Sequence, residues 1–501
     1  MLAIKRGLPG AKQTGLILGP ALFFLIMALP LPEGMALSAR AILACTVWIG
    51  TWWVTEAIPI PVTALMPIII FPLSGGLELK ATTGAFGNPL IFLFVGGFII
   101  AAAIRKWNLH QRIATNIIFW LGSKANRVVL GFMVATAFLS MWISNTATAV
   151  MMVPIGVAIA GQMGGDLRDN KFGKALMLGV AYAASIGGVA TLIGTPTNVI
   201  FTGVVSEMYG INDITFAKWM LFGLPISIVL LYICWQYLTR IAFPMKDVIL
   251  NGGREEIERQ LHDLGPITKE EKLVLYIFGG TAIAWMTRSF LLEPILPGIN
   301  DTIIAIAGAA ALFFIPAPSN KKMRLLDWET ATNIPWGVIL LFGGGLAIAN
   351  GFKTSGLAAY IGDLLMALNG LPLLLLILLL VASVNFLTEI TSNVATASMI
   401  LPILGSMAIA MAVHPYAFMV AVTLATSCAF MLPVATPPNA IVFGSNMLKI
   451  KDMVQAGVWM NVISILIMTA YVYFGLPIIW GIELFEFPEM FKTVATEVTL
   501  R

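Results

Sequence analysis

The amino-acid sequence predicts an all-α polytopic membrane protein with about eleven transmembrane helices and two re-entrant hairpins. Of its 501 residues, 59% are hydrophobic and 11% are charged, and the mean hydropathy is +0.91. Soluble domains are roughly 45–50% apolar and about 25% charged, so a water-soluble fold of this length is excluded. Apolar segments follow one another along the whole chain, which indicates one integral membrane unit.

The apolar segments of spanning length can be read off in order. These eleven segments cover residues 14–32, 40–56, 60–73, 89–105, 173–205, 217–240, 271–292, 299–316, 334–351, 416–446 and 454–482. Two further apolar segments, 128–162 and 371–411, are too long for one crossing. Each is interrupted near its middle by a Ser-Asn pair, Ser144-Asn145 or Ser392-Asn393. We expect both to be re-entrant hairpins, because polar, non-helical backbone at membrane depth is stable only inside protein or beside a cavity.

The positive charges support this topology. With the N-terminus in the cytoplasm, 22 of the 29 Lys and Arg residues fall on predicted cytoplasmic segments and seven on external ones. The positive-inside rule therefore predicts an external C-terminus. The alternative for the first segment is a cleaved signal peptide with a processing site near 36–39, but cleavage would remove the charged anchor.

The chain repeats itself at a constant offset, which is its most informative feature. At an offset of 248 the matched pairs are Phe94/Phe342, Gly96/Gly344, Ser140/Thr388, Ser144/Ser392, Asn145/Asn393, Thr148/Thr396 and Pro154/Pro402. A Thr-Pro-x-Asn motif follows at Thr195 to Asn198 and recurs at Thr436 to Asn439, at an offset of 241. The first hairpin is expected to enter from the cytoplasm and the second from outside, so the halves are inverted. Inverted repeats with interrupted apolar segments are typical of secondary transporters.

The polar residues near the predicted midplane constrain the ligand. All 29 Lys and Arg residues lie in loops or at membrane edges, and His110, His262 and His414 are also peripheral. An anion would therefore be held by hydroxyls, Asn amides and the N-terminal ends of the half-helices after each hairpin tip. The same oxygens, with carbonyls freed by the prolines, suit a hard cation such as sodium. The pattern favours an anion and sodium bound together.

The paired motifs resemble those of the divalent anion/sodium symporter family. Each Ser-Asn-x-Ala-Thr motif, 144–148 and 392–396, lies in a predicted hairpin and is followed by a Thr-Pro-x-Asn break. Residues 53–59 and 388–391 also match, and the resemblance covers essentially the whole chain.

The family resemblance implies a homodimer in the cytoplasmic (inner) membrane that works as an elevator. A scaffold of 1–127 and 246–370 would hold a mobile transport domain of 128–245 and 371–501. The transport domain would carry a C4-dicarboxylate (succinate, malate or fumarate) together with more than one sodium ion, the coupling ion.

The resemblance also implies the site residues. The first sodium site would use Ser140, Ser144, Asn145 and the backbone at Gly194. The second sodium site would use Thr388, Thr391, Asn393 and the backbone at Ala435. The substrate would meet Asn145, Thr146, Thr195, Asn393, Val394, Thr436 and Pro437. Many family members carry threonine in place of Val394, so one hydroxyl contact is missing and the preferred anion stays open.

Other functions are weighed against this one. An exchanger of the same fold, swapping dicarboxylates or tricarboxylates such as 2-oxoglutarate and citrate, keeps similar motifs and is the alternative. A membrane-embedded hydrolase using Ser144 or Ser392 lacks a midplane histidine or lysine base, so no enzyme is expected. An ion channel is disfavoured by the duplicated closed hairpins. The net charge of +4, without a dense basic tract, indicates no nucleic-acid partner.

Glu56 and Glu389 are the two acidic residues that the sequence places within the membrane, where an ionisable group is a functional candidate. Glu389 directly follows Thr388, so it could tune the second cation site, carry a proton or belong to a structural polar network. Glu56 lies near a predicted cytoplasmic edge, where a capping or interface role is expected.

Overall fold

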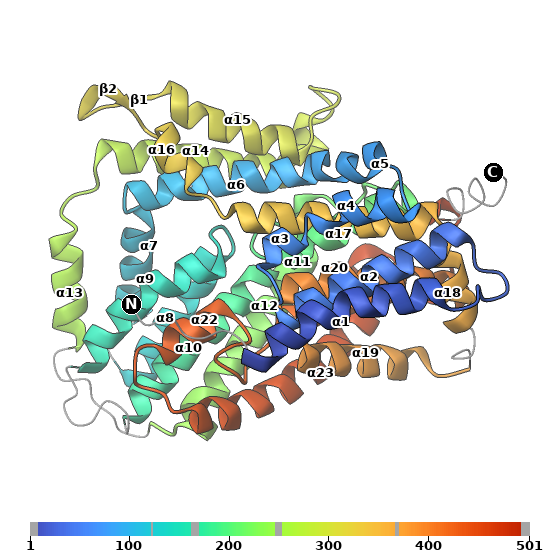
Figure 1. Ribbon diagram of the computed structural model, residues 1–501. Helices are drawn as coiled ribbons and strands as arrows, with labels where there is room; N and C mark the ends of the chain where they lie inside the picture. Colours follow the sequence, from blue (N-terminus) through green and yellow to red (C-terminus); the bar gives the residue numbers. More distant parts are fainter. Residues whose placement is uncertain (1–8, 122–123, 162–169, 246–252, 366–369, 492–501) are drawn as a thin grey trace.

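The computed structural model describes residues 9–121, 124–161, 170–245, 253–365 and 370–491, and these are mostly helical (Figure 1). The elements of the first half are α1 (Pro9–Ala28), α2 (Leu37–Thr55), α3 (Ile60–Thr63), α4 (Met66–Ser74), α5 (Leu79–Gly84), η1 (Ala85–Gly87), α6 (Pro89–Lys106), α7 (Leu109–Leu121), α8 (Ala125–Ser140), α9 (Asn145–Gly161), α10 (Lys171–Val189), α11 (Pro196–Tyr209), α12 (Phe216–Gln236) and η2 (Tyr237–Ala242).

The second half begins with a polar helix, and its later helices, from α17 onward, repeat the order of α6 to α12. Its elements are α13 (Gly253–Asp263), α14 (Lys269–Thr287), η3 (Arg288–Leu292), α15 (Asp301–Phe314), β1 (Pro316–Ala317), β2 (Asn320–Arg324), α16 (Trp328–Thr332), α17 (Trp336–Thr354), α18 (Leu357–Leu365), α19 (Leu373–Leu387), α20 (Asn393–Ala410), α21 (Pro415–Thr426), α22 (Pro437–Phe443) and α23 (Ile450–Trp480). The strands β1 and β2 pair antiparallel as a small hairpin.

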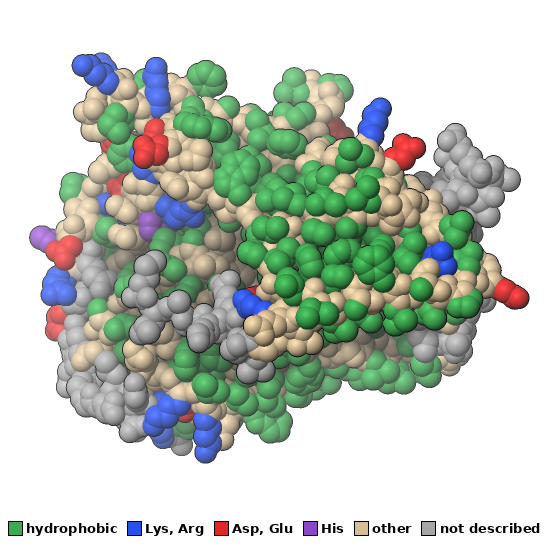
Figure 2. Space-filling view, viewed as in Figure 1, with side chains coloured by type: hydrophobic (Ala, Val, Ile, Leu, Met, Phe, Trp, Pro, Cys, Tyr) green, Lys and Arg blue, Asp and Glu red, His purple; other side chains and the backbone are tan. Residues whose placement is uncertain are grey.

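The predicted all-α polytopic fold is confirmed. Within the described residues, nine helical segments are long and apolar enough to cross a membrane, and α20 is one of them. The predicted spans 60–73, 299–316 and 416–446 are built from shorter apolar helices, namely α3 with α4, α15, and α21 with α22. Figure 2 shows a broad hydrophobic face over α1, α2 and α4, with most charged side chains toward the two ends of the molecule. Such a face suits contact with lipid acyl chains.

Both predicted hairpins are present as helix pairs with a short non-helical tip. In the first, α8 and α9 are joined by residues 141–144 and pack against α10. In the second, α19 and α20 are joined by residues 388–392 and pack against α21. Two further helices are interrupted at matching places. The first break, residues 190–195, separates α10 from α11, and the second break, residues 427–436, separates α21 from α22.

The two halves are inverted and interlocked. The equivalent helices α7 and α18 lie at opposite ends of the molecule (Figure 1). Across the halves, α9 of the first hairpin packs on α22, and α20 of the second hairpin packs on α11. The equivalent rings of Phe94 and Phe342 contact each other with centroids 6.3 Å apart. Equivalent residues meet in this way where they lie on a pseudo-two-fold axis.

Candidate functional site

The first hairpin tip brings oxygen atoms together at the start of α9. The Ser140 hydroxyl lies 2.5 Å from Asn145 Oδ1 and donates to the Ala184 carbonyl at 2.7 Å. If the Asn145 amide is turned over, its nitrogen instead donates to the Ala184 carbonyl at 3.1 Å and to the Gly194 carbonyl at 3.3 Å. Three oxygen atoms therefore surround the Asn145 amide, and the amide oxygen can become the fourth of the group.

Glycine at two positions lets the break approach this tip. A Cβ atom on Gly188 would lie 2.8 Å from Asn145 Oδ1, and one on Gly194 would lie 2.5 Å from the Gly188 carbonyl oxygen. Both distances are too short for a carbon atom, so any larger residue would push the Asn145 amide or the break out of place.

The second hairpin tip repeats the central contact. The Thr388 hydroxyl donates to Asn393 Oδ1 at 2.6 Å and lies 3.4 Å from the Thr426 carbonyl. The Thr391 hydroxyl, in contrast, is bonded within the hairpin: it lies 2.7 Å from Thr396 Oγ1 and donates to the Leu387 carbonyl. The sequence-derived pair Thr388 and Asn393 is thus brought together, whereas Thr391 is engaged elsewhere.

Two asparagines that sequence reasoning did not select as site residues close the breaks. Asn198 donates its side-chain nitrogen to the Thr191 carbonyl at 2.8 Å and lies 3.3 Å from the carbonyls of residues 188 and 189. Asn439 does the same in the second half, to the Leu432 carbonyl at 3.0 Å and to that of residue 429 at 3.3 Å. Their signal was present in the sequence, since each is the last residue of a Thr-Pro-x-Asn motif. They satisfy carbonyls that the interrupted helix leaves unpaired.

The other sequence-derived residues lie around the tips and breaks. Thr195 and Thr436 are buried, and each directly precedes a helix that begins with proline; Ala435 and Gly194 are buried within the breaks. Thr146 and Pro437 are exposed, Val394 is half-buried, and the Ser144 hydroxyl accepts from the Ala147 N–H at 3.4 Å. The second break touches the start of α11, where Thr197 Oγ1 lies 2.9 Å from Ser427 Oγ.

Helix ends also shape the electrostatics at the tips. The long helices α9 and α20 begin at Asn145 and Asn393, and α11 begins at Pro196. The first N–H groups of a helix have no intrahelical acceptor, and together with the helix dipole they favour negative charge nearby. The two hairpin tips therefore combine clustered oxygen atoms, a ligand type that suits a hard cation, with helix ends that favour an anion.

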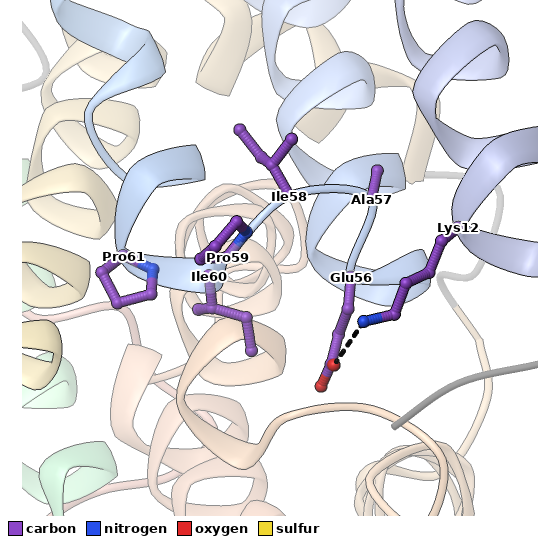
Figure 3. A pocket seen from close by; sticks show the side chains of 7 residues that line it. All are labelled: Lys12, Glu56, Ala57, Ile58, Pro59, Ile60 and Pro61. Atoms are coloured by element: carbon purple, nitrogen blue, oxygen red, sulfur yellow. Dashed lines mark ion pairs between the residues drawn. The ribbon is translucent and has the colours of Figure 1, made fainter. Parts of the chain in front are cut away.

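A cavity of about 330 Å³ lies at the turn between α2 and α3, and its lining includes no hairpin-tip residue (Figure 3). Its wall is formed by Glu56 to Pro61 and by Lys12 of α1, whose Nζ is 3.9 Å from Glu56 Oε2. Glu56 ends α2 in the left-handed conformation, with φ of 47°, and its side chain is about one third exposed, at 34%. Glu56 therefore caps a helix at the surface, and only Glu389 of the two acids is buried.

Comparison with known proteins agrees with the sequence motifs. The sequence model of the family described as the sodium:sulfate symporter transmembrane region matches residues 11–481 of this chain. The chain is 46% identical over 482 residues to the sodium-dependent dicarboxylate transporter SdcS of Staphylococcus saprophyticus, covering 94% of this chain and 93% of the relative. It is 45% identical over 491 residues to SdcS of Staphylococcus aureus, covering 96% and 94%.

Two solved structures share the fold at 14% sequence identity. MtrF of Neisseria gonorrhoeae aligns with a TM-score of 0.56 over 94% of this chain and 97% of its own. The YdaH transporter of Alcanivorax borkumensis aligns with a TM-score of 0.57 over 87% and 98%. The family model, the relatives and the duplicated motifs agree that this chain is a multi-pass membrane protein belonging to the sodium:sulfate symporter family, the divalent anion/sodium symporters.

Proposed function

We propose that this protein is a sodium-coupled symporter of C4-dicarboxylates such as succinate, malate and fumarate in the cytoplasmic membrane. The observation that carries the proposal is the duplicated contact between a hydroxyl and an asparagine amide, Ser140 with Asn145 and Thr388 with Asn393. The names of relatives that are 45–46% identical over nearly the whole chain support the choice of sodium and dicarboxylate.

The first cation site is proposed at Ser140, Ser144, Asn145 and the Gly194 carbonyl. Sodium prefers oxygen ligands, and the Asn145 amide can present either nitrogen or oxygen to the Ala184 and Gly194 carbonyls. When the amide oxygen faces those carbonyls, four oxygen atoms lie close together, and the Ser140 hydroxyl is the one hydrogen-bond donor among them. A cation at their centre would replace the missing donors, so sodium binding and the orientation of Asn145 are linked.

The second cation site is proposed at Thr388, Asn393 and the backbone at Ala435. The Thr388 hydroxyl and Asn393 amide oxygen lie 2.6 Å apart, and the Thr426 carbonyl oxygen lies 3.4 Å from the same hydroxyl. Thr391 would contribute only if its hydroxyl left Thr396. Otherwise the Thr391 side chain only stabilises the hairpin through its hydrogen bonds to Leu387 and Thr396.

The dicarboxylate is proposed to lie between the two tips. Each carboxylate would meet one asparagine amide, Asn145 or Asn393, and the free N–H groups of one helix end. Thr146, Thr195 and Thr436 would add hydroxyls, and Val394 and Pro437 apolar contact. Sodium ions on the far side of each asparagine would compensate the charge of the dianion, which makes anion and cation binding mutually dependent.

Transport is proposed to occur by an elevator movement in a homodimer. Residues 1–127 and 246–370 would form the scaffold, and residues 128–245 and 371–501 the moving part. The N-terminus would lie in the cytoplasm and the C-terminus outside, although residues 1–8 and 492–501 themselves lie outside the described residues. The contacts of α9 with α22 and of α20 with α11 support a single moving body, because each hairpin packs on a broken helix of the other half.

The proposal is tested by uptake of radiolabelled succinate into proteoliposomes. Uptake is measured with and without an inward sodium gradient, at two clamped membrane potentials. If at least three sodium ions accompany one dianion, net positive charge enters, and each charge gains about 2.3 kcal/mol per 100 mV, so uptake should rise with an inside-negative potential. Uptake that ignores sodium and accelerates with internal dicarboxylate would reject symport and identify an exchanger.

A further inference from the structure

Glu389 lies in the tip of the second hairpin with only 3% of its surface exposed. Its Oε1 accepts from the backbone N–H groups of Phe430 at 2.7 Å and Met431 at 2.9 Å, and its Oε2 accepts from that of Leu432 at 3.0 Å. Asn461 of α23 donates its side-chain nitrogen to Oε1 at 2.7 Å. Four N–H groups thus point at one buried carboxylate.

The three backbone N–H groups belong to the second break, where no helical carbonyl is available to them. An unpaired buried N–H costs about 1–3 kcal/mol, so the carboxylate stabilises this non-helical conformation. From the other side, Asn439 donates to the carbonyls of Ala429 and Leu432. The segment 429–432 is therefore held at both its N–H and its carbonyl groups.

The first half supports its break with neutral groups. The position equivalent to Glu389 is Met141, whose carbonyl accepts from the Thr191 hydroxyl. Thr191 Oγ1 in turn accepts from the Gly194 N–H at 3.1 Å. Val189, equivalent to Phe430, accepts at its carbonyl from Trp219 Nε1 at 3.0 Å. The carboxylate is thus a feature of the second half that its repeat lacks at the same position.

We propose that Glu389 is a positioning residue for the second cation site, one that fixes residues 430–432 and supplies a negative charge that raises the sodium affinity at Thr388 and Asn393. The inference rests on the proposed function above. We place Glu389 behind the site and not among its ligands, because its Oε1 accepts three N–H bonds and its Oε2 accepts one from the backbone of the second break. It adjoins Thr388 in the chain, and in a poorly hydrated interior a full charge acts on a cation more strongly, at a given distance, than it does in water.

The test replaces the charge with a side chain of the same shape. In Glu389→Gln, the sodium concentration for half-maximal succinate uptake should rise about tenfold or more, because the cation loses a nearby opposite charge. The maximal rate at saturating sodium, and the succinate KM measured there, should stay within about threefold, because the dicarboxylate contacts are unchanged. Met141→Leu, an apolar exchange at the equivalent position of the first half, is the matched control and should behave as the wild type.

A second variant separates the charge from the bracing contact. Asn461→Leu removes one of the four donors, together with the Oδ1 atom that accepts from the Phe430 N–H at 3.2 Å, and it keeps the carboxylate. Its sodium half-saturation should therefore stay within about threefold of the wild type. Wild-type sodium dependence in Glu389→Gln, or an equal rise in both variants, would overturn the proposal. If Glu389→Gln does not yield folded protein, a tenfold rise in Asn461→Leu alone overturns it.

Failure of the proposed function can be told apart from failure of this inference. Binding of radioactive sodium to the purified full-length protein gives the same comparison of variants without any transport. A wild-type protein that binds sodium and takes up no succinate would reject the proposed symport, while the sodium affinities of Glu389→Gln and Asn461→Leu would still decide the role of Glu389.

Discussion

The two hairpins share the residues proposed as ligands and differ in the contacts that support them. In both, a hydroxyl at the end of the first hairpin helix contacts the asparagine that begins the second, Ser140 with Asn145 and Thr388 with Asn393. In both, an asparagine after the break binds the carbonyls of the break. These duplicated contacts mark what the site requires, since mere packing has no reason to recur in register.

The interactions that support these contacts differ in kind at equivalent positions of the two halves. In the first half, Gly187 lets the backbone of α10 touch that of α8, and a Cβ there would lie 2.3 Å from the Ala137 carbonyl oxygen. In the second half, Asn385 replaces Ala137 and donates to the carbonyl of Cys428, which replaces Gly187, at 2.6 Å. The first half relies on close packing of two helix backbones and the second on a side-chain hydrogen bond. The same arrangement of hairpin residues can therefore be stabilised in two ways.

The largest effect on transport is expected from the two asparagines whose contacts are the same in both halves. Asn145→Ala or Asn393→Ala should each lower sodium-coupled succinate uptake by roughly 100-fold or more, because each removes an amide that is proposed to bind cation and anion together. The measurement is initial uptake in proteoliposomes, with size-exclusion chromatography to show folded protein. Uptake at the wild-type rate in both variants would refute the site.

The next effect separates the two supports. Gly187→Ala forces a methyl group into the backbone of Ala137 and should lower the free energy of unfolding by about 1–3 kcal/mol. The control is Cys428→Ala at the equivalent position, which removes one buried sulfur atom and should cost less. Thermal unfolding of the purified proteins compares them, and equal melting temperatures for Gly187→Ala and wild type would contradict the close contact.

A smaller effect tests the hydrogen-bonded support. Asn385→Leu leaves the Cys428 carbonyl without its donor and should cost about 0.5–1.5 kcal/mol of unfolding free energy. Part of this loss is offset, because the substitution also removes Asn385 Oδ1, a buried oxygen without a hydrogen-bond partner. Thermal unfolding is again the measurement, and a raised melting temperature would show that the hydrogen bond contributes less than the unpaired oxygen costs.

The smallest difference concerns one pair of threonines. Thr396 Oγ1 is bonded to Thr391, whereas the equivalent Thr148 Oγ1 is buried without a partner, since Ile143 stands where the second half has Thr391. Thr396→Val should therefore cost about 0.5–1 kcal/mol, while Thr148→Val should be neutral or slightly stabilising. Melting temperatures of the two variants decide, and a greater loss for Thr148→Val would reverse the comparison.

Much of the fold was predictable because membrane spans carry a strong local signal. The apolar segments 128–162 and 371–411, each interrupted at a Ser-Asn pair, became the helix pairs α8–α9 and α19–α20. The Thr-Pro-x-Asn motifs marked the two breaks, because proline cannot continue the hydrogen bonding of a helix. What length and hydropathy could not give was that the predicted span 299–316 is the short helix 301–314, and that the first helix of the broken span 416–446 already ends at Thr426.

Less of the site was predictable, since its supports join residues far apart in the chain. The self-match identified Asn145 and Asn393, yet it gave no sign that Glu389 reaches Phe430 or that Asn385 reaches Cys428. Thr391 shows the converse. Its equivalent is Ile143, so the repeat already indicated that this hydroxyl lacks a counterpart, and the structure pairs it with Thr396.

The reciprocal packing of the halves has a consequence for biosynthesis. The helix α9 ends at Gly161, but α22, on which it packs, is complete only at Phe443. At roughly 5–20 residues per second of chain growth, the first hairpin waits on the order of tens of seconds for its partner. The second hairpin meets α11 already made. During synthesis, the packing surface of the first hairpin is therefore exposed for longer than that of the second. A chain that stops near residue 245 leaves the side of α9 that faces α22 uncovered.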